Sequence, residues 1–319
     1  MRRSLRFYRH RHVAVAAGAA VACAVLTGAL LVGDSVRGSL RDLALERLGA
    51  TDLALVGQGF VSQTLAGRLE AALRDGGGDA ARVVSLLSLP GTAVAAESRA
   101  RASRVTVLGV EGSFATLWPA STLDFEEGGG GQSPFPPVIL NEPLQRELGV
   151  EPGDAVVLSF SAAAEVPRGS LMGRRDAGEV LETLRLTVAA VVPTTGPGAF
   201  SLASTQIEPL NAFVPLDRLQ RALGQPGRIN TLLVAGTPGA EGRAMVEAAR
   251  DRVLELADLG LRLERRGSGL ELTNDRFVLR ASTVEAVQSL AHDLGATTWP
   301  LRSYLANTIE VVSGAGYVG

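Results

Sequence analysis

Residues 1–32 read MRRSLRFYRHRHVAVAAGAAVACAVLTGALLV, a basic head followed by twenty residues without a charge, Val13 to Val32. A helix of that length, at about 1.5 Å per residue, spans the roughly 30 Å hydrocarbon core of a bilayer. Basic residues beside a spanning segment are retained on the cytoplasmic side. We therefore expect a cytoplasmic head over residues 1–12, a transmembrane helix over residues 13–33, and an extracytoplasmic remainder held at the cell (inner) membrane.

A cleaved signal peptide is the alternative interpretation, because it also combines a basic head with an apolar core. The apolar run is longer than the roughly 7–15 residues of a signal core, and no small-x-small cleavage site precedes Asp34. Its alanine and glycine content suits close helix packing in a membrane. The same content makes the run only moderately hydrophobic, so cleavage stays open beside the expected anchor.

Composition excludes several classes of site. The net charge of −2 leaves no basic field for nucleic acid outside the head. Cys23 is the single cysteine and lies in the apolar run, so the external part forms neither a disulfide nor a thiolate metal site. The chain has no lysine, which removes the P-loop and Schiff-base lysines. His10 and His12 belong to the head, so His292 alone remains outside, and no cofactor is expected.

The segment that follows the run, GDSVRGSLRDLALERLGA, has apolar positions near helical spacing with charged residues between them. Asp34 or Ser35 can cap the start of such a helix, and Gly49 can end it. Only one glycine separates this segment from the apolar run. The pattern therefore predicts an amphipathic stalk over residues 34–49, or alternatively the first packed helix of a globular domain. The apolar stalk positions are Val36, Leu40, Leu43 and Leu48.

The remainder alternates strands and helices irregularly, with hairpins instead of repeated βαβ units. This order predicts an α+β domain over residues 50–319, with two lobes and the middle segment inserted. Pro90-Gly91 predicts a turn between two strands, and Asn141 predicts the cap of a short helix that ends at Gly149. The expected strands cover residues 51–56, 83–89, 92–96, 104–110, 138–140, 155–160, 184–192 and 229–235, with two more within 261–280. The expected helices cover residues 62–73, 216–223, 241–259 and 282–294.

His292-Asp293 is the first of the few candidates for chemistry. With Glu285 seven residues earlier, it could join a serine in a Ser–His–Asp arrangement. No G-x-S-x-G elbow is present, and a solvated helix surface is the simpler interpretation.

Glu126-Glu127 could bind a cation, and Gly128–Gly131 could cradle a phosphate. Both lie in a glycine- and proline-rich segment without a strand–loop–helix setting, which indicates a plain loop. Asp251, Glu255 and Asp258 are spaced to share one face of a helix, and we expect a charged outer face there. We therefore predict no catalytic, cofactor-binding or metal site, and a non-enzymatic module.

Several segments, taken in order, resemble the extracytoplasmic core domain of MacB/FtsX-type ABC transporter permeases. The most specific pair is the apolar helix that runs into GDSVRGSL and the later unit VILNEPLQRELGVEPGD. The ordered set covers nearly the whole chain. Its other members are VTVLGVEGSF, LTVAAVVPTTGPGAF, FVPLDRLQRALGQPGRINTLLV and LRSYLANTI.

This resemblance implies a permease with a first transmembrane helix, a periplasmic domain of two lobes, and three further membrane helices beyond residue 319. It implies that the chain is a fragment or truncated form. It also implies a homo- or heterodimer that receives ATP-driven motion from a separate ATP-binding subunit and moves lipoprotein, peptide or small-molecule cargo. Two alternatives remain: a single-pass anchored binding or sensor module, and a secreted hydrolase that uses His292.

Overall fold

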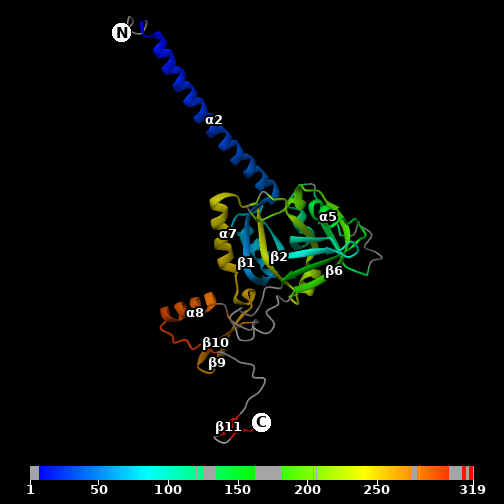
Figure 1. The fold of residues 1–319 in the computed structure, drawn as a ribbon. Coiled ribbons are helices and arrows are strands. Elements are labelled where there is room, and N and C mark those ends of the chain that lie inside the picture. Colours follow the sequence, from blue (N-terminus) through cyan, green and yellow to red (C-terminus); the bar gives the residue numbers. More distant parts are fainter. Residues whose placement is uncertain are drawn as a thin grey trace. The chain divides into compact units, whose positions relative to one another are not determined.

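The apolar run lies inside one continuous 40-residue helix, α2 (Arg9–Leu48), in the computed structural model of the chain (Figure 1). The structure describes residues 7–119, 121, 123–125, 134–161, 181–203, 205, 207–274, 279, 281–301, 311–313 and 316–318. At about 1.5 Å per residue, α2 is about 60 Å long, roughly twice the thickness of a hydrocarbon core. Asp34 and Ser35 lie inside this helix, so neither caps a separate one.

Gly49 ends α2, as the sequence predicts. Its φ of +59° lies in the left-handed region, which glycine adopts without a steric penalty. Its N–H donates to the carbonyl oxygens of Leu45 and Glu46. The chain passes from this turn directly into the first strand, which begins at Thr51.

The domain that follows is a mixture of strands and short helices, which confirms the predicted mixed α/β class behind one N-terminal apolar helix. Its strands are β1 (Thr51–Ser62), β2 (Arg82–Ala95), β3 (Arg101–Val110), β4 (Pro137–Asn141), β5 (Ala155–Ser161), β6 (Leu181–Val192), β7 (Leu210–Pro215), β8 (Arg228–Ala235), β9 (Leu261–Arg266) and β10 (Gly269–Asn274). Its helices are α3 (Thr64–Asp75), α4 (Gly112–Ala115), α5 (Glu142–Leu148), α6 (Leu216–Ala222) and α7 (Gly239–Val253), with the 3₁₀ turns η2 (Gly196–Ala199) and η3 (Leu256–Leu259).

Six strands form a closed ring in the order β2, β3, β7, β4, β6, β5 and back to β2. The β3–β7 and β4–β6 pairs are parallel, and the other pairs are antiparallel. The first part of β2 pairs instead with β8, and β8 pairs with β1. Strand β2 therefore belongs both to the ring and to a three-stranded sheet, and the other ring strands lie between β2 and β8 in the chain.

Strand β2 is one 14-residue strand, so the predicted turn at Pro90-Gly91 is wrong. Residues 82–86 pair with β8 and residues 91–95 pair with β5, so the change of partner falls beside this dipeptide. Proline fits there because it has no N–H to donate to a second neighbour. In the same gap the Asn230 side chain accepts from the Ser88 N–H at 2.9 Å and donates to its carbonyl at 2.7 Å.

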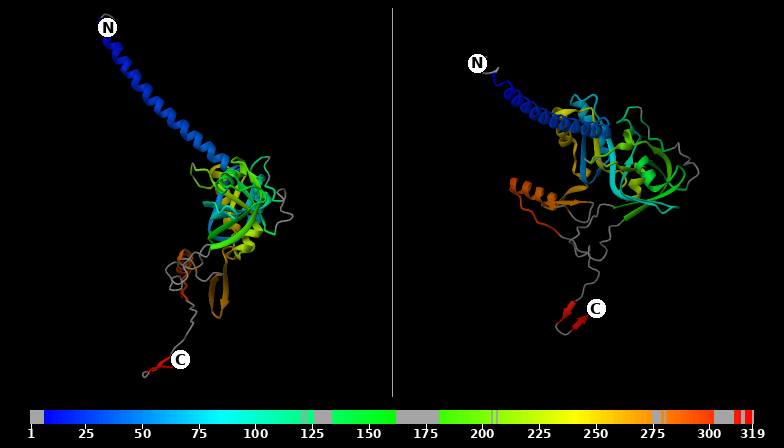
Figure 2. Two further views of the ribbon diagram at one scale, coloured as in Figure 1. Left: turned by 45° about the vertical axis from the view of Figure 1, so that its right-hand side comes forward. Right: turned by 45° about the horizontal axis from the view of Figure 1, so that its top comes forward.

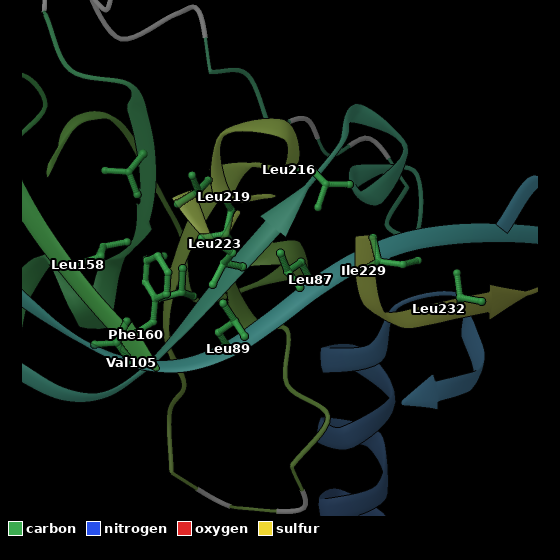
Figure 3. Close-up of a cluster of buried hydrophobic side chains, with 14 of the residues drawn as sticks. Leu87, Leu89, Val105, Leu158, Phe160, Leu216, Leu219, Leu223, Ile229 and Leu232 are labelled. Atoms are coloured by element: carbon green, nitrogen blue, oxygen red, sulfur yellow. The ribbon is translucent and has the colours of Figure 1, made fainter. Parts of the chain in front are cut away.

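Alternate residues of the ring strands form one apolar core with residues of α6 and β8, some of which are labelled in Figure 3. The same core also includes residues of α3, α5 and α7. Val105, Leu158 and Phe160 are buried from the strands, and Leu216 and Leu219 are buried from α6. Each such side chain contributes roughly 1.5–3 kcal/mol of transfer free energy on burial. A second buried cluster uses residues that alternate with these on several of the same strands, and it underlies the end of α2.

Helices α3 and α7 pack against each other, and α3 also contacts β2. Helix α7 ends at Val253, so the single helix predicted over residues 241–259 is wrong. Leu254 has a ψ of 122°, which is extended backbone. Glu255 and Asp258 then form a capping box around η3. These local side-chain bonds compete with continuation of the helix.

Residues 1–272 form one compact unit and residues 273–319 another. The described part of the second unit contains α8 (Ala281–Asp293), which agrees with the predicted helix, and a hairpin of β11 (Val311–Ser313) and β12 (Gly316–Val318) (Figure 2).

Candidate functional site

The last turn of α2 is where this helix contacts the domain, and Arg47 is the buried residue of the helix, 6% exposed. Its guanidinium donates to the carbonyl oxygens of Thr205 at 2.5 Å and Ile207 at 3.4 Å. Both acceptors belong to the segment between η2 and β7. Hydrogen bonds of charged donors contribute roughly 1.5–3 kcal/mol each. The helix end is thus tied to a segment 158 residues later in the chain.

Trp118 makes a second contact with the helix end. Its indole Nε1–H donates to the Glu46 carbonyl at 3.1 Å, one of the last carbonyls of the helix, which also accepts the longer 3.3 Å bond from the Gly49 N–H. The Ala50 N–H donates to the Leu117 carbonyl at 2.8 Å. A Cβ on Gly49 would lie 2.6 Å from that carbonyl oxygen and 2.7 Å from the Trp118 ring. Glycine is therefore required at position 49 by space as well as by φ.

Four aromatic rings continue inward from this contact. Trp118 and Phe114 have ring centroids 5.2 Å apart, and Phe200 packs edge-on against both, at 5.9 and 5.2 Å. Phe213 of β7 lies 6.0 Å from Phe114. Each aromatic pair adds roughly 0.5–1.5 kcal/mol beyond the area that it buries. The helix end therefore rests on a buried cluster that includes a ring strand.

Two fully buried asparagines hold the segment that carries Phe200. Asn141 caps α5 by accepting from the Leu144 N–H at 3.3 Å, as the sequence predicts. Its Oδ1 also accepts from the Asn211 N–H at 3.0 Å, and its Nδ2 donates to the Gly198 carbonyl at 2.9 Å. Asn211 Nδ2 donates to the carbonyls of Gly198 at 3.2 Å and Phe200 at 2.9 Å. These bonds join η2 to β4 and β7.

We name the set Arg47, Gly49, Trp118, Phe200, Asn141 and Asn211 the junction. Its contacts run without a gap from the last turn of α2 through the aromatic rings to two strands of the ring. Packed rings and buried hydrogen bonds make such a network stiff, because displacing one member leaves its partners unpaired. Among the described residues, Asn211 Oδ1 is the one atom of the two asparagine side chains that has no hydrogen-bond partner. The arrangement can hold the end of α2 in a fixed orientation on the domain.

A second polar contact joins α3 to η3. Arg68 bonds Asp258, and its other nitrogen lies 2.9 Å from Glu255. The hydrogen bond that Arg68 donates to Asp258 raises the pKa of the Arg68 guanidinium above its ordinary value, so it stays charged. Asp258 is buried, so the charged outer helix face predicted for Asp251, Glu255 and Asp258 is wrong. The helix ends before Glu255, and Asp258 turns inward to the arginine.

The structure places the predicted stalk positions on an exposed helix. Val36 is 53% exposed, and Leu40 and Leu43 are each 39% exposed. Leu48 is half-buried at the junction. Val13 and Val32, the predicted ends of the spanning segment, are also exposed in α2. Their roles in a membrane stay predictions.

The predicted chemical candidates are not brought together in the described residues. His292 and Asp293 are exposed neighbours, with Nδ1 3.7 Å from the carboxylate oxygen. Glu126-Glu127 and Gly128–Gly131 lie outside the described residues. No group of three or more His, Cys, Asp or Glu side chains suited to a metal ion occurs in the part of the chain that the structure describes.

Sequence reasoning missed most of the junction. In the sequence, Arg47 is indistinguishable from the other charged residues of an amphipathic helix. No motif near Asn211 indicates that its side chain is buried and hydrogen-bonded. The sequence predicts Asn141 as a helix cap, which it is, but its bonds to Asn211 and Gly198 depend on the pairing of strands that are distant in the chain. The scarcity of tryptophan was the one available signal, since the chain has only two.

Comparison with known proteins gives distant matches. No protein-family model and no curated protein matches the chain. The periplasmic region of MacB from Actinobacillus actinomycetemcomitans is 11% identical over 77% of this chain and 97% of its own, with a TM-score of 0.38. The extracellular domain of the noncanonic ABC-type transporter YknZ from Gram-positive bacteria is 14% identical over 63% of this chain and 94% of its own, with a TM-score of 0.33. At sequence identities of 11% and 14% and TM-scores of 0.38 and 0.33, neither match assigns this chain to a family.

Proposed function

We propose that the chain is a permease component of an ABC transporter, in which α2 crosses the membrane and passes motion to an extracytoplasmic domain. The observation that carries the proposal is the continuity of α2 from the apolar run to the junction. Among the described residues, α2 is the one helix long and apolar enough to cross a membrane. The sequence resemblance to MacB/FtsX-type permeases supports the same role.

The charge pattern orients the chain across the membrane. The arginines of the head stay in the cytoplasm, and Asp34 begins the external part. From Val32 to Leu48, α2 rises about 24 Å, so the domain sits well outside the hydrocarbon core. The proposed location is the cell (inner) membrane, with the domain on the outer side.

The proposed transmission of motion depends on the stiffness of α2. Helix α2 contains no proline, and its end is fixed by the junction, so a change in its tilt moves the domain with it. For a helix about 60 Å long, a tilt change of about 10° displaces one end by about 10 Å. We propose that a separate ATP-binding subunit drives this movement in a dimer of permeases. The chain itself is then non-catalytic.

The two-lobe organisation belongs to the same proposal. The ring would form one lobe, and the sheet of β1, β8 and the first part of β2, with α3 and α7, would form the other. The inserted middle segment then corresponds to ring strands β3 to β7. Cargo of the lipoprotein, peptide or small-molecule class would be moved by these lobes without entering the ring, whose interior is filled by side chains.

The test compares two seven-residue insertions after Gly38, which is exposed on α2. One is flexible (GGSGGSG), and the other is helical (AEAARAE) and adds two turns. Each chain carries Cys23→Ala and Glu151→Cys, because Cys23 is otherwise a free thiol that would also be labelled. It is purified from native membranes together with any bound ATPase and spin-labelled at position 151. Distances are then measured with and without ATP and vanadate. We expect an ATP-dependent change in the distance between two copies, kept by the helical insertion and lost with the flexible one. An unaltered change with the flexible insertion would contradict the proposal.

A single-pass anchored binding module is the second candidate, favoured by the presence of one membrane-length helix among the described residues. Purification from native membranes separates the two candidates. A permease brings an ATP-binding subunit with it, whereas an anchored module brings none and its domain does not respond to ATP.

A further inference from the structure

The hairpin of β9 and β10 has an apolar face and a charged face. A two-residue turn, Gly267-Ser268, joins the two strands, so Arg266 lies opposite Gly269 and Leu263 lies opposite Leu272. Because side chains alternate along a strand, every leucine of the hairpin then lies on one face and most of its charged residues lie on the other. The leucines are Leu261, Leu263, Leu270 and Leu272.

Both the leucine face and the outer edge of β9 are open. Leu263 is 51% exposed and Leu270 is 67% exposed. Among the described residues, β9 pairs with β10 and with no other strand. An isolated two-stranded hairpin is at best marginally stable in water, and three or more strands with an apolar face are needed for independent stability. An open strand edge is also a template for pairing with another chain.

The register of the hairpin determines which backbone groups of β9 are available at this edge. The two residues that flank a two-residue turn bond each other, so Arg266 and every second residue before it direct their N–H and C=O groups toward β10. The residues between them direct these groups away from β10, toward the open edge. They are Leu261, Leu263 and Arg265. A further strand must therefore bond these three residues.

The open edge of β9 is complementary to itself. In an antiparallel pair with Leu263 opposite the partner's Leu263, the three available residues of both strands bond each other through about six backbone hydrogen bonds. Arg262 then lies opposite the partner's Glu264, and two-fold symmetry makes this contact twice. These opposed residues form non-hydrogen-bonded pairs with Cα atoms about 4.5 Å apart, the arrangement that brings side chains closest.

The charges of β9 also select this register over its neighbours. In the next register on either side that keeps the leucines on one face, Glu264 lies opposite the partner's Glu264, or Arg262 lies opposite the partner's Arg262. Like charges at directly opposed positions destabilise a strand pair, whereas opposite charges stabilise it. Strand β10 has a single charged residue, Glu271, and so offers no such selection.

We propose that β9 pairs antiparallel with β9 of a second copy of this chain. The pairing joins two hairpins into a four-stranded sheet whose leucines are continuous on one face, which supplies the strands that a lone hairpin lacks. Pairing of β9 does not depend on the transport function proposed above or on where the domain lies relative to a membrane, because it uses the hairpin alone. It applies equally to an anchored binding module.

The test measures self-association of the full chain in detergent micelles by sedimentation velocity over a range of concentrations. Arg262→Glu and Glu264→Arg each reverse one member of both ion pairs, and the double variant restores both pairs with the charges exchanged. The matched controls are Arg243→Glu and Glu247→Arg, which make the same reversals in an exposed ion pair of α7.

We expect the unaltered chain to dimerise. Its dissociation constant should rise about tenfold or more with each single reversal in β9 and return to within about threefold in the double variant. The control reversals should leave it nearly unchanged. A monomeric unaltered chain would overturn the proposal. A dimer that the β9 reversals leave intact would overturn it too, because it would assign self-association to another surface, such as α2.

Disulfide trapping reads the register without reversing a charge. In a Cys23→Ala background, a chain with Arg262→Cys is mixed with a chain with Glu264→Cys, which places two thiols at opposed positions about 4.5 Å apart between Cα atoms and keeps one ion pair. Either variant alone places its thiols on a diagonal of about 7–8 Å, beyond easy reach of a disulfide. Mild oxidation should therefore cross-link the mixture several-fold more than either variant alone. Equal cross-linking in all three samples would contradict the proposed pairing.

Discussion

Replacing Arg47 by methionine removes both hydrogen bonds that this side chain makes at the junction and keeps much of its apolar stem. The bond to the Thr205 carbonyl is short, at 2.5 Å, and the bond to Ile207 is weak, at 3.4 Å. A charged donor contributes roughly 1.5–3 kcal/mol per good bond, and relief from burying the charge offsets part of this. We expect a net loss of about 2 kcal/mol, or about 30-fold in the equilibrium constant for unfolding.

The chain supplies its own reporter for this measurement. Trp118 is buried at the junction, whereas Trp299 is 82% exposed, and the chain has only these two tryptophans. In a Trp299→Phe background, the emission of Trp118 follows the junction during a urea titration of the full chain in detergent micelles. Arg47→Met should lower the urea midpoint and shift the native emission to longer wavelength.

Arg41→Met is the matched control, because Arg41 is exposed on the same helix and lies before the junction. It should leave the midpoint and the emission unchanged. Equal midpoints for Arg47→Met and the unaltered chain, or equal losses for both variants, would refute the role given to Arg47.

Three further substitutions test the structure by thermal and urea unfolding. Gly49→Ala combines a positive φ with a contact of 2.6 Å, so we expect a loss of about 2–4 kcal/mol, and a loss under about 0.5 kcal/mol would contradict the close approach. Asn141→Ala removes a helix cap and leaves the Gly198 and Pro209 carbonyls without this donor, so the expected loss is about 3–5 kcal/mol, with a neutral result as the contrary outcome. Arg104→Gly relieves a positive φ and should raise stability by about 0.5–1 kcal/mol, which a destabilised variant would disprove.

The sequence predicts local structure well where local chemistry decides it. Gly49 and Gly149 end their helices, and both have positive φ. Asn141 caps α5, as its place before Glu142-Pro143 indicates. In each case the residue type and its neighbours within four positions are enough to predict the helix end or cap, although Gly49 also lies against the distant residues Leu117 and Trp118.

The sequence predictions are wrong where contacts between residues distant in the chain determine the local structure. Pro90-Gly91 is a strong turn signal in isolation, but pairing with β3 on one side and a change of partner on the other keep the strand extended. Asp258 has helical spacing with its neighbours, yet it is buried and paired with Arg68, a partly exposed residue 190 positions away in the chain. Local periodicity carries no information about such partners.

The candidate site was predictable only in its outline. The apolar run and the stalk pattern locate where the helix meets the domain, and Gly49 marks the end. The contacts that hold the C-terminal end of α2 on the domain involve Trp118, Phe200 and Asn211, which come from three separate segments. Ring closure brings them together, and no pattern within one segment predicts it.

The central claim is that one unbroken helix runs from the membrane segment to the junction. Spin labels at Ala14 and Arg41, in a Cys23→Ala chain in nanodiscs, measure it directly by pulsed electron resonance. An unbroken helix places the two backbones about 40 Å apart, with a narrow distance distribution. A broad distribution, or one centred below about 30 Å, would show a break between membrane and domain and would contradict the account.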